Sequence, residues 1–116
     1  MPHWVHQKVE MRPLLGKAFF YTHSFSLILF SFRAIADLEE VSKELREQIQ
    51  RDLKALQTSP FPSGNQMKRL KGFRPSIYRL RSGDLRVLYH IREDRVTVLR
   101  VVNRKLLERV IRRLNL

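Results

Sequence analysis

Three arginines alternate with apolar residues in two short neighbouring segments. Residues 77–82 read IYRLRS and residues 85–91 read LRVLYHI, on either side of a Gly-Asp pair. Two such segments around a short glycine-containing loop predict an antiparallel β-hairpin. Because successive strand side chains point to opposite faces, Arg79, Arg81 and Arg86 can share one face. Arginine stays charged and its planar fork contacts two oxygens, so this face suits phosphate binding.

The charge of the chain is concentrated in the same half. Residues 1–67 hold 8 Lys/Arg and 7 Asp/Glu, whereas residues 68–116 hold 15 Lys/Arg and 4 Asp/Glu, within a total of +12. A basic half on a chain of 116 residues favours a polyanionic partner, either nucleic acid or an acidic protein segment. The chain has no cysteine. This excludes disulfides, thiol nucleophiles and cysteine metal sites, and it fits a cytoplasmic protein.

An ordered set of motifs surrounds the predicted hairpin. KRLKG at residues 68–72 comes first, then YRLRS at residues 78–82, the Gly-Asp turn, and LRVLY at residues 85–89. This set resembles the RelE/ParE superfamily of toxins from type II toxin–antitoxin pairs, and most closely its RelE-like members. The resemblance spans residues 25–116 and does not reach residues 1–23.

The resemblance implies a toxin that cuts messenger RNA in the ribosomal A site, with the ribose 2′-hydroxyl as internal nucleophile. It implies the ribosome, mRNA and a cognate acidic antitoxin as partners, and no metal or cofactor. By position it implies catalytic roles for Arg79, Arg81, Arg86 and Arg104. The same alignment of motifs implies RNA-binding roles for Lys68, Arg69, Lys71 and Arg74.

The sequence departs from the RelE-like pattern in its candidates for proton transfer. Several family members have lysine where this chain has Arg79 and Arg81, and arginine is a poor general base. Active members also carry a Tyr or His near the C-terminus, where this chain reads LLERVIRRLNL. His90 shares a strand face with Arg86 and is a possible acid or base. We favour the simpler interpretation of His90 as a side chain at the sheet rim.

The N-terminal half carries helical periodicity after one short apolar strand at residues 25–31. Residues 32–41 predict a helix with Phe32, Ile35, Ala36 and Leu38 on its apolar side and Asp37, Glu39 and Glu40 outside. Ser42 can cap a second helix. In that helix a stripe at i, i+4, i+8 and i+11 predicts packing on a sheet; it comprises Leu45, Ile49, Leu53 and Leu56.

The C-terminal part predicts a last strand at residues 95–102 and a short basic helix at residues 104–114. The order is β-α-α-β-β-β-α, an α+β fold with a helical hairpin packed on a mostly antiparallel four-stranded sheet. We expect one domain at residues 24–116, preceded by a poorly ordered extension at residues 1–23. The sheet face opposite the hairpin is expected to stay partly open as a concave basic surface. The apolar stretch at residues 18–32 is shorter than the ~20 apolar residues of a membrane helix, so we expect no membrane partner.

Two other functions remain open at this point. A ParE-like toxin shares the fold and inhibits DNA gyrase without cleaving RNA, usually without a clustered basic face. A nucleic-acid-binding domain without toxicity would explain the charge but not the ordered motifs. Whatever the function of this chain, its clustered arginines repel one another in the free protein. Removing Arg81 or Arg86 is therefore expected to leave the stability of the protein unchanged or higher.

Overall fold

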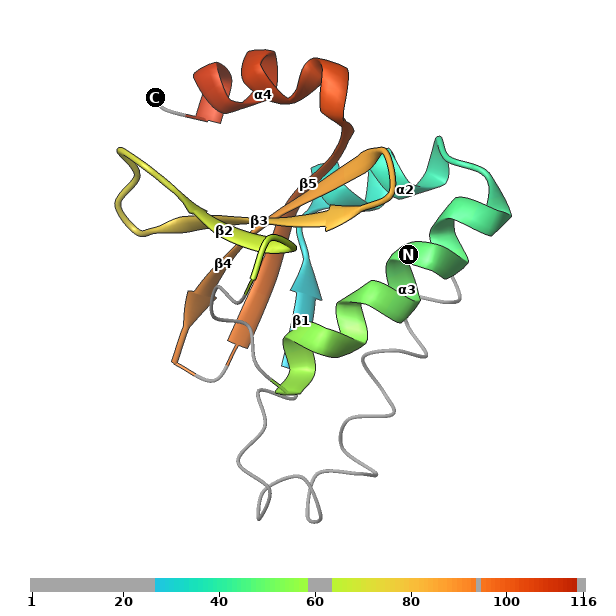
Figure 1. The fold of residues 1–116 in the computed structure, drawn as a ribbon, viewed down its shortest axis with the longest axis horizontal. Coiled ribbons are helices and arrows are strands. Elements are labelled where there is room, and N and C mark those ends of the chain that lie inside the picture. The colour runs from blue at the N-terminus through green and yellow to red at the C-terminus, as the bar shows by residue number, and fades with distance from the viewer. Residues whose placement is uncertain (1–26, 59–63, 94, 115–116) are drawn as a thin grey trace.

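The computed structural model describes residues 27–58, 64–93 and 95–114, so the predicted extension at residues 1–23 lies outside the described part. Two helices lie on one side of a sheet and a third lies on the other side (Figure 1). The elements are β1 (Leu27–Phe30), α2 (Phe32–Glu39), α3 (Lys43–Thr58), β2 (Met67–Leu70), β3 (Ile77–Ser82), β4 (Leu85–Arg92), β5 (Arg95–Asn103), the 3₁₀ turn η1 (Arg104–Leu106) and α4 (Leu107–Leu114). The predicted α+β architecture is confirmed.

The sheet has five strands in the order β1-β5-β4-β3-β2, not the four that the sequence predicted. β1 runs parallel to β5, and the other neighbours are antiparallel. The additional strand is β2, which includes the start of the KRLKG motif at residues 68–72, where the sequence predicts no strand. Lys68 and Arg69 fill its centre, and such charges hide a strand from periodicity arguments. They are typical of an edge strand, where they discourage pairing with other chains.

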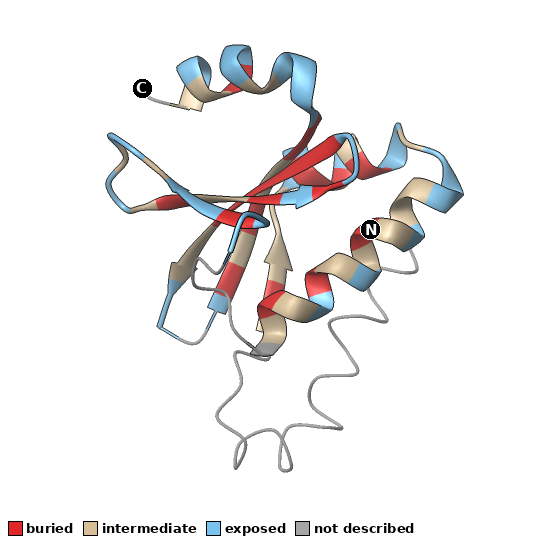
Figure 2. Cartoon of the chain, in the orientation of Figure 1, coloured by how far each residue is buried: buried red, intermediate tan, exposed pale blue. Residues whose placement is uncertain are grey.

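The helical hairpin packs on the sheet through its predicted stripe. Ile49, Leu53 and Leu56 are fully buried against side chains of the strands. The second helix begins as expected, because the Ser42 hydroxyl accepts a hydrogen bond from the backbone N of Leu45 at 3.2 Å. Figure 2 shows buried residues along the central strands and on the sides of α2 and α3 that face them.

The first helix is rotated relative to the prediction. Its buried residues are Ala34, Ile35 and Leu38, whereas Ala36 is exposed and Phe32 is 91% exposed. Ser31 explains the rotation. Its backbone N donates to Val98 O at 2.9 Å and its hydroxyl donates to Leu99 O at 2.8 Å, so the start of α2 is fixed on β5. The Ser31 hydroxyl also caps the helix by accepting from Ala34 N.

A second, smaller core lies on the opposite face of the sheet. Val110 of α4 is buried there with Ile77, Leu88 and Val102. Leu107, Ile111 and Leu114 pack around them, which confirms the predicted apolar side of this helix. The face that carries the predicted arginines is therefore covered at its centre by α4 and open only beside it.

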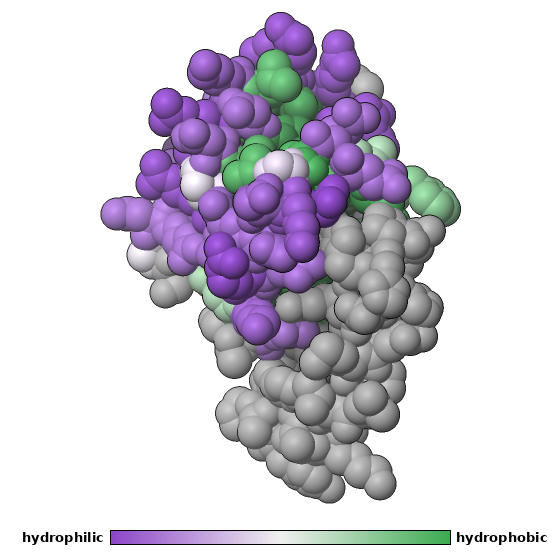
Figure 3. Space-filling model, turned by 90° about the vertical axis from the view of Figure 1, so that its right-hand side faces the viewer, coloured by the Kyte–Doolittle hydropathy of each residue, from purple (hydrophilic) through white to green (hydrophobic). Residues whose placement is uncertain are grey.

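The outer surface of the described residues is mostly hydrophilic on the side drawn in Figure 3, with a few hydrophobic side chains between. The large hydrophobic side chains exposed in the described part are Phe32 and Leu106. Within the same part, none of the helices has the length and apolar content required to cross a membrane.

Candidate functional site

Strand register gathers four basic residues on the α4 side of the sheet. Lys68 of β2 lies opposite Arg79 of β3, and Arg81 of β3 lies opposite Arg86 of β4. Arg79 and Arg81 are two residues apart, so both side chains leave the same face. We call Lys68, Arg79, Arg81 and Arg86 the basic cluster.

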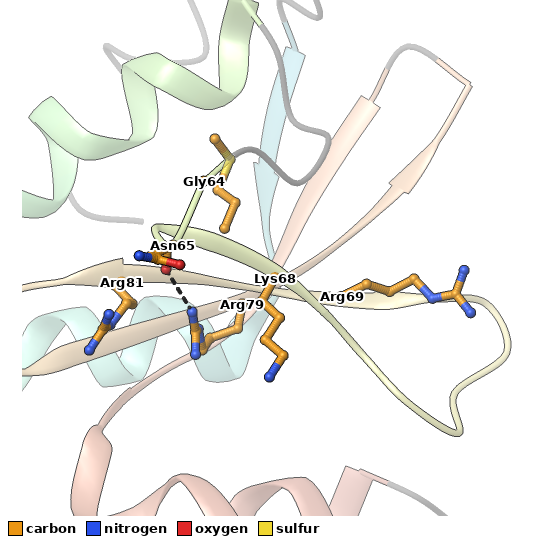
Figure 4. A pocket seen from close by; sticks show the side chains of 7 residues that line it. Gly64, Asn65, Lys68, Arg69, Arg79 and Arg81 are labelled. Carbon is orange, nitrogen blue, oxygen red and sulfur yellow. Dashed lines mark hydrogen bonds between the residues drawn. The ribbon is translucent and has the colours of Figure 1, made fainter.

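A groove of about 560 Å³ opens at the β2 and β3 side of this cluster. Lys68, Arg79 and Arg81 extend to the same side, whereas Arg69 extends away (Figure 4). Arg79 Nη2 donates to the backbone O of Asn65 at 3.1 Å, which holds the guanidinium at the groove wall. The lining residues are Gly64, Asn65, Met67, Lys68, Arg69, Arg79 and Arg81.

The segment before β2 also positions the cluster. Gln66 O accepts from Arg81 N at 2.8 Å, and the Gln66 side chain donates to Arg81 O at 3.4 Å. The hydrogen bonding to β3 thus extends one residue before the start of β2 and fixes the backbone of Arg81. Sequence reasoning missed Asn65 and Gln66, because the contacts of Asn65 O and Gln66 O involve backbone atoms that leave no signal in residue type.

Arg86 is less accessible than the sequence suggested, with only 6% of the residue exposed. Its Nη1 donates to the backbone O of Gly83 at 2.8 Å and to that of Leu85 at 2.9 Å. Gly83 has φ +60°, and a Cβ there would lie 2.5 Å from the amide nitrogen of Gln48, so this turn favours glycine. Arg86 therefore stabilises the β3–β4 turn as well as contributing charge to the cluster.

The cluster concentrates positive charge. Burial, and then the charges of Arg81 and Arg86, lower the pKa of Arg79 below its ordinary value. Burial also lowers the pKa of Arg86, with smaller contributions from Arg81 and Arg104. The buried Nε of Arg79 has no hydrogen-bond partner among the described residues. A bound anion would supply the missing negative charge.

Arg104 lies where β5 ends, beside the turn that Arg86 stabilises. Its backbone N donates to Asp84 O at 2.9 Å, and its Nε is 3.9 Å from Asp84 Oδ1. Its charge lowers the pKa of Arg86, so it is close enough to extend the cluster electrostatically. The structure thus brings Lys68, Arg79, Arg81, Arg86 and Arg104 to one region of the sheet.

The other predicted RNA-binding residues do not join the cluster. Arg69 is opposite Tyr78 and leaves the other face of the sheet, although it contributes to the groove wall. Lys71 and Arg74 are exposed in the connection between β2 and β3, beyond the end of the groove.

His90 lies on the same strand face as Arg86 but is separated from it by the buried Leu88. Burial, with a smaller contribution from Arg92, lowers the pKa of His90, and its Nδ1 is buried without a partner in the described part. Whether His90 takes part in the chemistry stays a prediction. Within the described residues, no three His, Asp or Glu side chains gather as metal ligands.

The fold, together with the match to a family model, places the chain in the RelE/ParE superfamily of toxins. The family model described as the ParE toxin of type II toxin–antitoxin systems, parDE, matches residues 28–106. The chain therefore belongs to this family. The motifs that suggested the superfamily, at residues 68–89, lie within the matched region.

Solved toxin–antitoxin structures share the fold. The chain is similar to a protein in the RelB–RelE complex of Methanococcus jannaschii, with 25% identity, a TM-score of 0.58, and coverage of 71% of this chain and 96% of that one. It is also similar to a protein in the RelE–RelB complex of Pyrococcus horikoshii, with 21% identity, a TM-score of 0.58, and coverage of 67% of this chain and 93% of that one. A protein in the RelBE2 complex of Mycobacterium tuberculosis has 22% identity and a TM-score of 0.58, with coverage of 66% of this chain and 95% of that one. No curated protein matches the chain.

Proposed function

We propose that this toxin is a ribosome-dependent mRNA endoribonuclease whose substrate backbone binds in the groove beside the basic cluster. The observation that supports this most is the register that places Lys68 opposite Arg79 and Arg81 opposite Arg86 on one face. Four cations at this density suit consecutive phosphates of single-stranded RNA. Both mRNA and ribosomes are cytoplasmic, so we place the toxin's action in the cytoplasm.

In the proposed reaction the ribose 2′-oxygen attacks the adjacent phosphorus. The new P–O2′ bond forms as the P–O5′ bond breaks, which leaves a 2′,3′-cyclic phosphate and a 5′-hydroxyl. The arginines stabilise the charge that develops on the phosphate oxygens. Arginine stays protonated in proteins, so the arginines act in this reaction as cations and not as bases.

The ribosome dependence is proposed from the composition of the groove. Among the described residues that line it, there is no His, Tyr, Asp or Glu. The groove thus offers charge stabilisation but few groups for proton transfer, and cleavage of free RNA should be very slow. We propose that the ribosome positions the mRNA so that in-line attack by the 2′-oxygen becomes fast.

The test compares two neighbouring basic residues on opposite faces of β2. In a translation reaction with mapping of RNA ends, Lys68→Ala should lower the cleavage rate by about 10²–10³, the usual loss for one transition-state contact. Arg69→Ala removes the same charge from the same strand, but Arg69 contributes only to the groove wall and leaves the opposite face of the sheet, so we expect a much smaller loss of cleavage. Equal effects of both substitutions would contradict the assigned groove.

Inhibition of DNA gyrase is the second candidate function. The match to the ParE family model favours it, and so does the burial of Arg86, which leaves fewer free cations for catalysis. A supercoiling assay with purified gyrase separates the two functions. Loss of supercoiling without new RNA ends would replace the nuclease proposal by this one.

We also propose a cognate antitoxin that is net acidic and covers the basic cluster and the helical hairpin. The similarity to a protein from a RelB–RelE complex supports a partner of this kind. Opposite charges steer the two proteins together, and salt screens them, so binding should weaken as salt is added. An affinity that is independent of salt would contradict this electrostatic account.

A further inference from the structure

One carboxylate stands among the basic residues of β2, β3 and β4. Residues 64–92 contain 8 Lys/Arg, and Asp84 is the single acidic residue among them. It lies in the turn that connects β3 to β4, next to the carbonyls that Arg86 contacts. Its Oδ1 is 3.9 Å from Arg104 Nε, and the two side chains are 80% and 60% exposed.

The backbone carbonyl of Asp84 has a structural role, and its side-chain carboxylate has an electrostatic one. Its carbonyl O accepts from Arg104 N at 2.9 Å, which holds Arg104 beside the turn whatever the side chain at position 84. The carboxylate adds negative charge. It raises the pKa of Arg86, against the lowering by burial, Arg81 and Arg104. The Asp84 carboxylate is thus within electrostatic reach of both the cluster and Arg104.

We propose that Asp84 is an internal counter-ion of the basic cluster, and that it competes with the phosphates of the RNA substrate for Arg104. This inference rests on the proposed binding of an RNA backbone at the cluster. In the free protein Arg104 pairs with Asp84. When a phosphate arrives, Arg104 leaves the carboxylate and turns to the anion. Asp84 is therefore a positioning residue that weakens the binding of phosphate at the cluster.

The proposal requires that Asp84 affect stability and binding in opposite directions. Without its carboxylate, Arg86 and Arg104 lose a neutralising charge, so the free protein becomes slightly less stable. A bound phosphate no longer meets a nearby like charge and no longer displaces an ion pair, so it binds more tightly. A residue that only supported the fold would lower both stability and affinity when replaced.

The test uses the full chain and a single-stranded 2′-O-methyl RNA oligonucleotide, which cannot be cleaved because its 2′-oxygen is blocked. Binding is measured by fluorescence anisotropy, beside thermal melts. Asp84→Asn keeps the turn chemistry and should tighten binding about two- to fivefold, the size expected for an exposed ion pair. Glu93→Gln is the control. It removes one charge from the β4–β5 turn, at the far end of β4 and beyond the reach of screened charges.

A double-mutant cycle with Arg104→Ala tests whether Asp84 affects RNA binding through Arg104. If Asp84 acts through Arg104, Asp84→Asn should gain little affinity in the Arg104→Ala background. Arg104→Ala in the Asp84→Asn background should reduce the slope of log K against log salt by about 0.7, as for one lost phosphate contact on a single strand. A gain that persists without Arg104, or equal gains from Asp84→Asn and Glu93→Gln, would overturn the proposal.

This experiment is independent of the nuclease assay. Binding that responds to Asp84 in a protein that does not cleave RNA would leave this inference standing and remove the proposed enzymatic function. Absence of oligonucleotide binding by both the wild type and Asp84→Asn would overturn the counter-ion proposal, whatever the result of the cleavage assay.

Discussion

Asp37 of α2 and Arg100 of β5 form an ion pair in which Arg100 Nε donates to Asp37 Oδ2 at 2.8 Å and Nη2 donates to Oδ1 at 3.1 Å. The same Oδ2 accepts from the backbone N of Val101 at 2.8 Å. β1 pairs with β5 only as far as Val98. Beyond that residue β5 has no neighbouring strand on this side, and the Asp37 carboxylate accepts the hydrogen bond of the backbone N of Val101 instead.

We expect Asp37→Ala to cost about 2–4 kcal/mol in free energy of unfolding, because it leaves Arg100 unpaired and Val101 N without its acceptor. The two side chains are only 17% and 16% exposed, so solvent replaces these bonds poorly. Urea unfolding measures the loss. Glu39→Ala on the same helix removes an exposed acid and should change stability by less than about 0.5 kcal/mol. Similar losses for both variants would mean that the ion pair does not stabilise the fold.

The sequence predicted the elements better than their contacts. The stripe from Leu45 to Leu56 and the hairpin at residues 77–91 depend on local periodicity, and both are confirmed. Asp37 was placed on the outer face of its helix. Its partner Arg100 lies 63 residues away in the sequence, and local periodicity gives no information about contacts at that separation. The strand β2 was missed for a related reason, since its pairing with β3 is what defines it.

The candidate site shows the same limit. Alternation in β3 and β4 places Arg79, Arg81 and Arg86 on one face, and the strand register agrees with that. Residue type alone did not indicate that Arg86 is buried against its own turn. It also did not indicate that Asn65 O holds Arg79, because that contact involves a backbone atom. Whether these residues act on RNA remains a prediction.

The core of the helical hairpin gives a direct stability test. Leu53 is fully buried at the middle of the α3 stripe, so Leu53→Ala should cost about 2–5 kcal/mol. That is a large share of the stability of a domain of this size. Lys54→Ala, at the next and exposed position of the helix, should be nearly neutral. A loss below about 1 kcal/mol for Leu53→Ala in chemical denaturation would contradict the packing.

His90 predicts how stability depends on pH. Burial and Arg92 lower its pKa in the folded state, whereas the unfolded chain should titrate near the ordinary value of about 6.5. The unfolded state therefore binds more protons as pH falls below about 6.5. The stability contribution of neutral His90 is complete above that pH and is lost as pH falls through the folded pKa.

Denaturant unfolding at pH 7.5 and pH 5.0 tests this dependence. The wild type should lose more stability between the two conditions than His90→Gln, which cannot titrate. The other histidines and the carboxylates are common to both proteins, so the difference isolates His90. The same loss in both would show that protonation of His90 is not linked to unfolding.

Arg81 and Arg86 should separate function from stability, although they lie directly opposite each other. Arg81 is exposed, so Arg81→Ala relieves repulsion within the cluster and should leave the melting temperature unchanged or higher. Arg86 is buried and donates to the turn carbonyls of Gly83 and Leu85. Arg86→Ala should therefore cost about 1–3 kcal/mol, which revises the expectation from sequence that both substitutions spare the fold.

The two variants are compared by thermal melts and by growth arrest after induced expression. Arg81→Ala should abolish arrest in a protein that melts like the wild type, because losing one phosphate contact commonly lowers a rate by about 10²–10³. Loss of arrest in Arg86→Ala is informative only beside its melting curve, since partial unfolding also removes toxicity. Full toxicity of a stable Arg81→Ala would place the functional surface elsewhere. Destabilisation by Arg81→Ala would instead mean that its charge is compensated in the free protein, contrary to the repulsion inferred for the cluster.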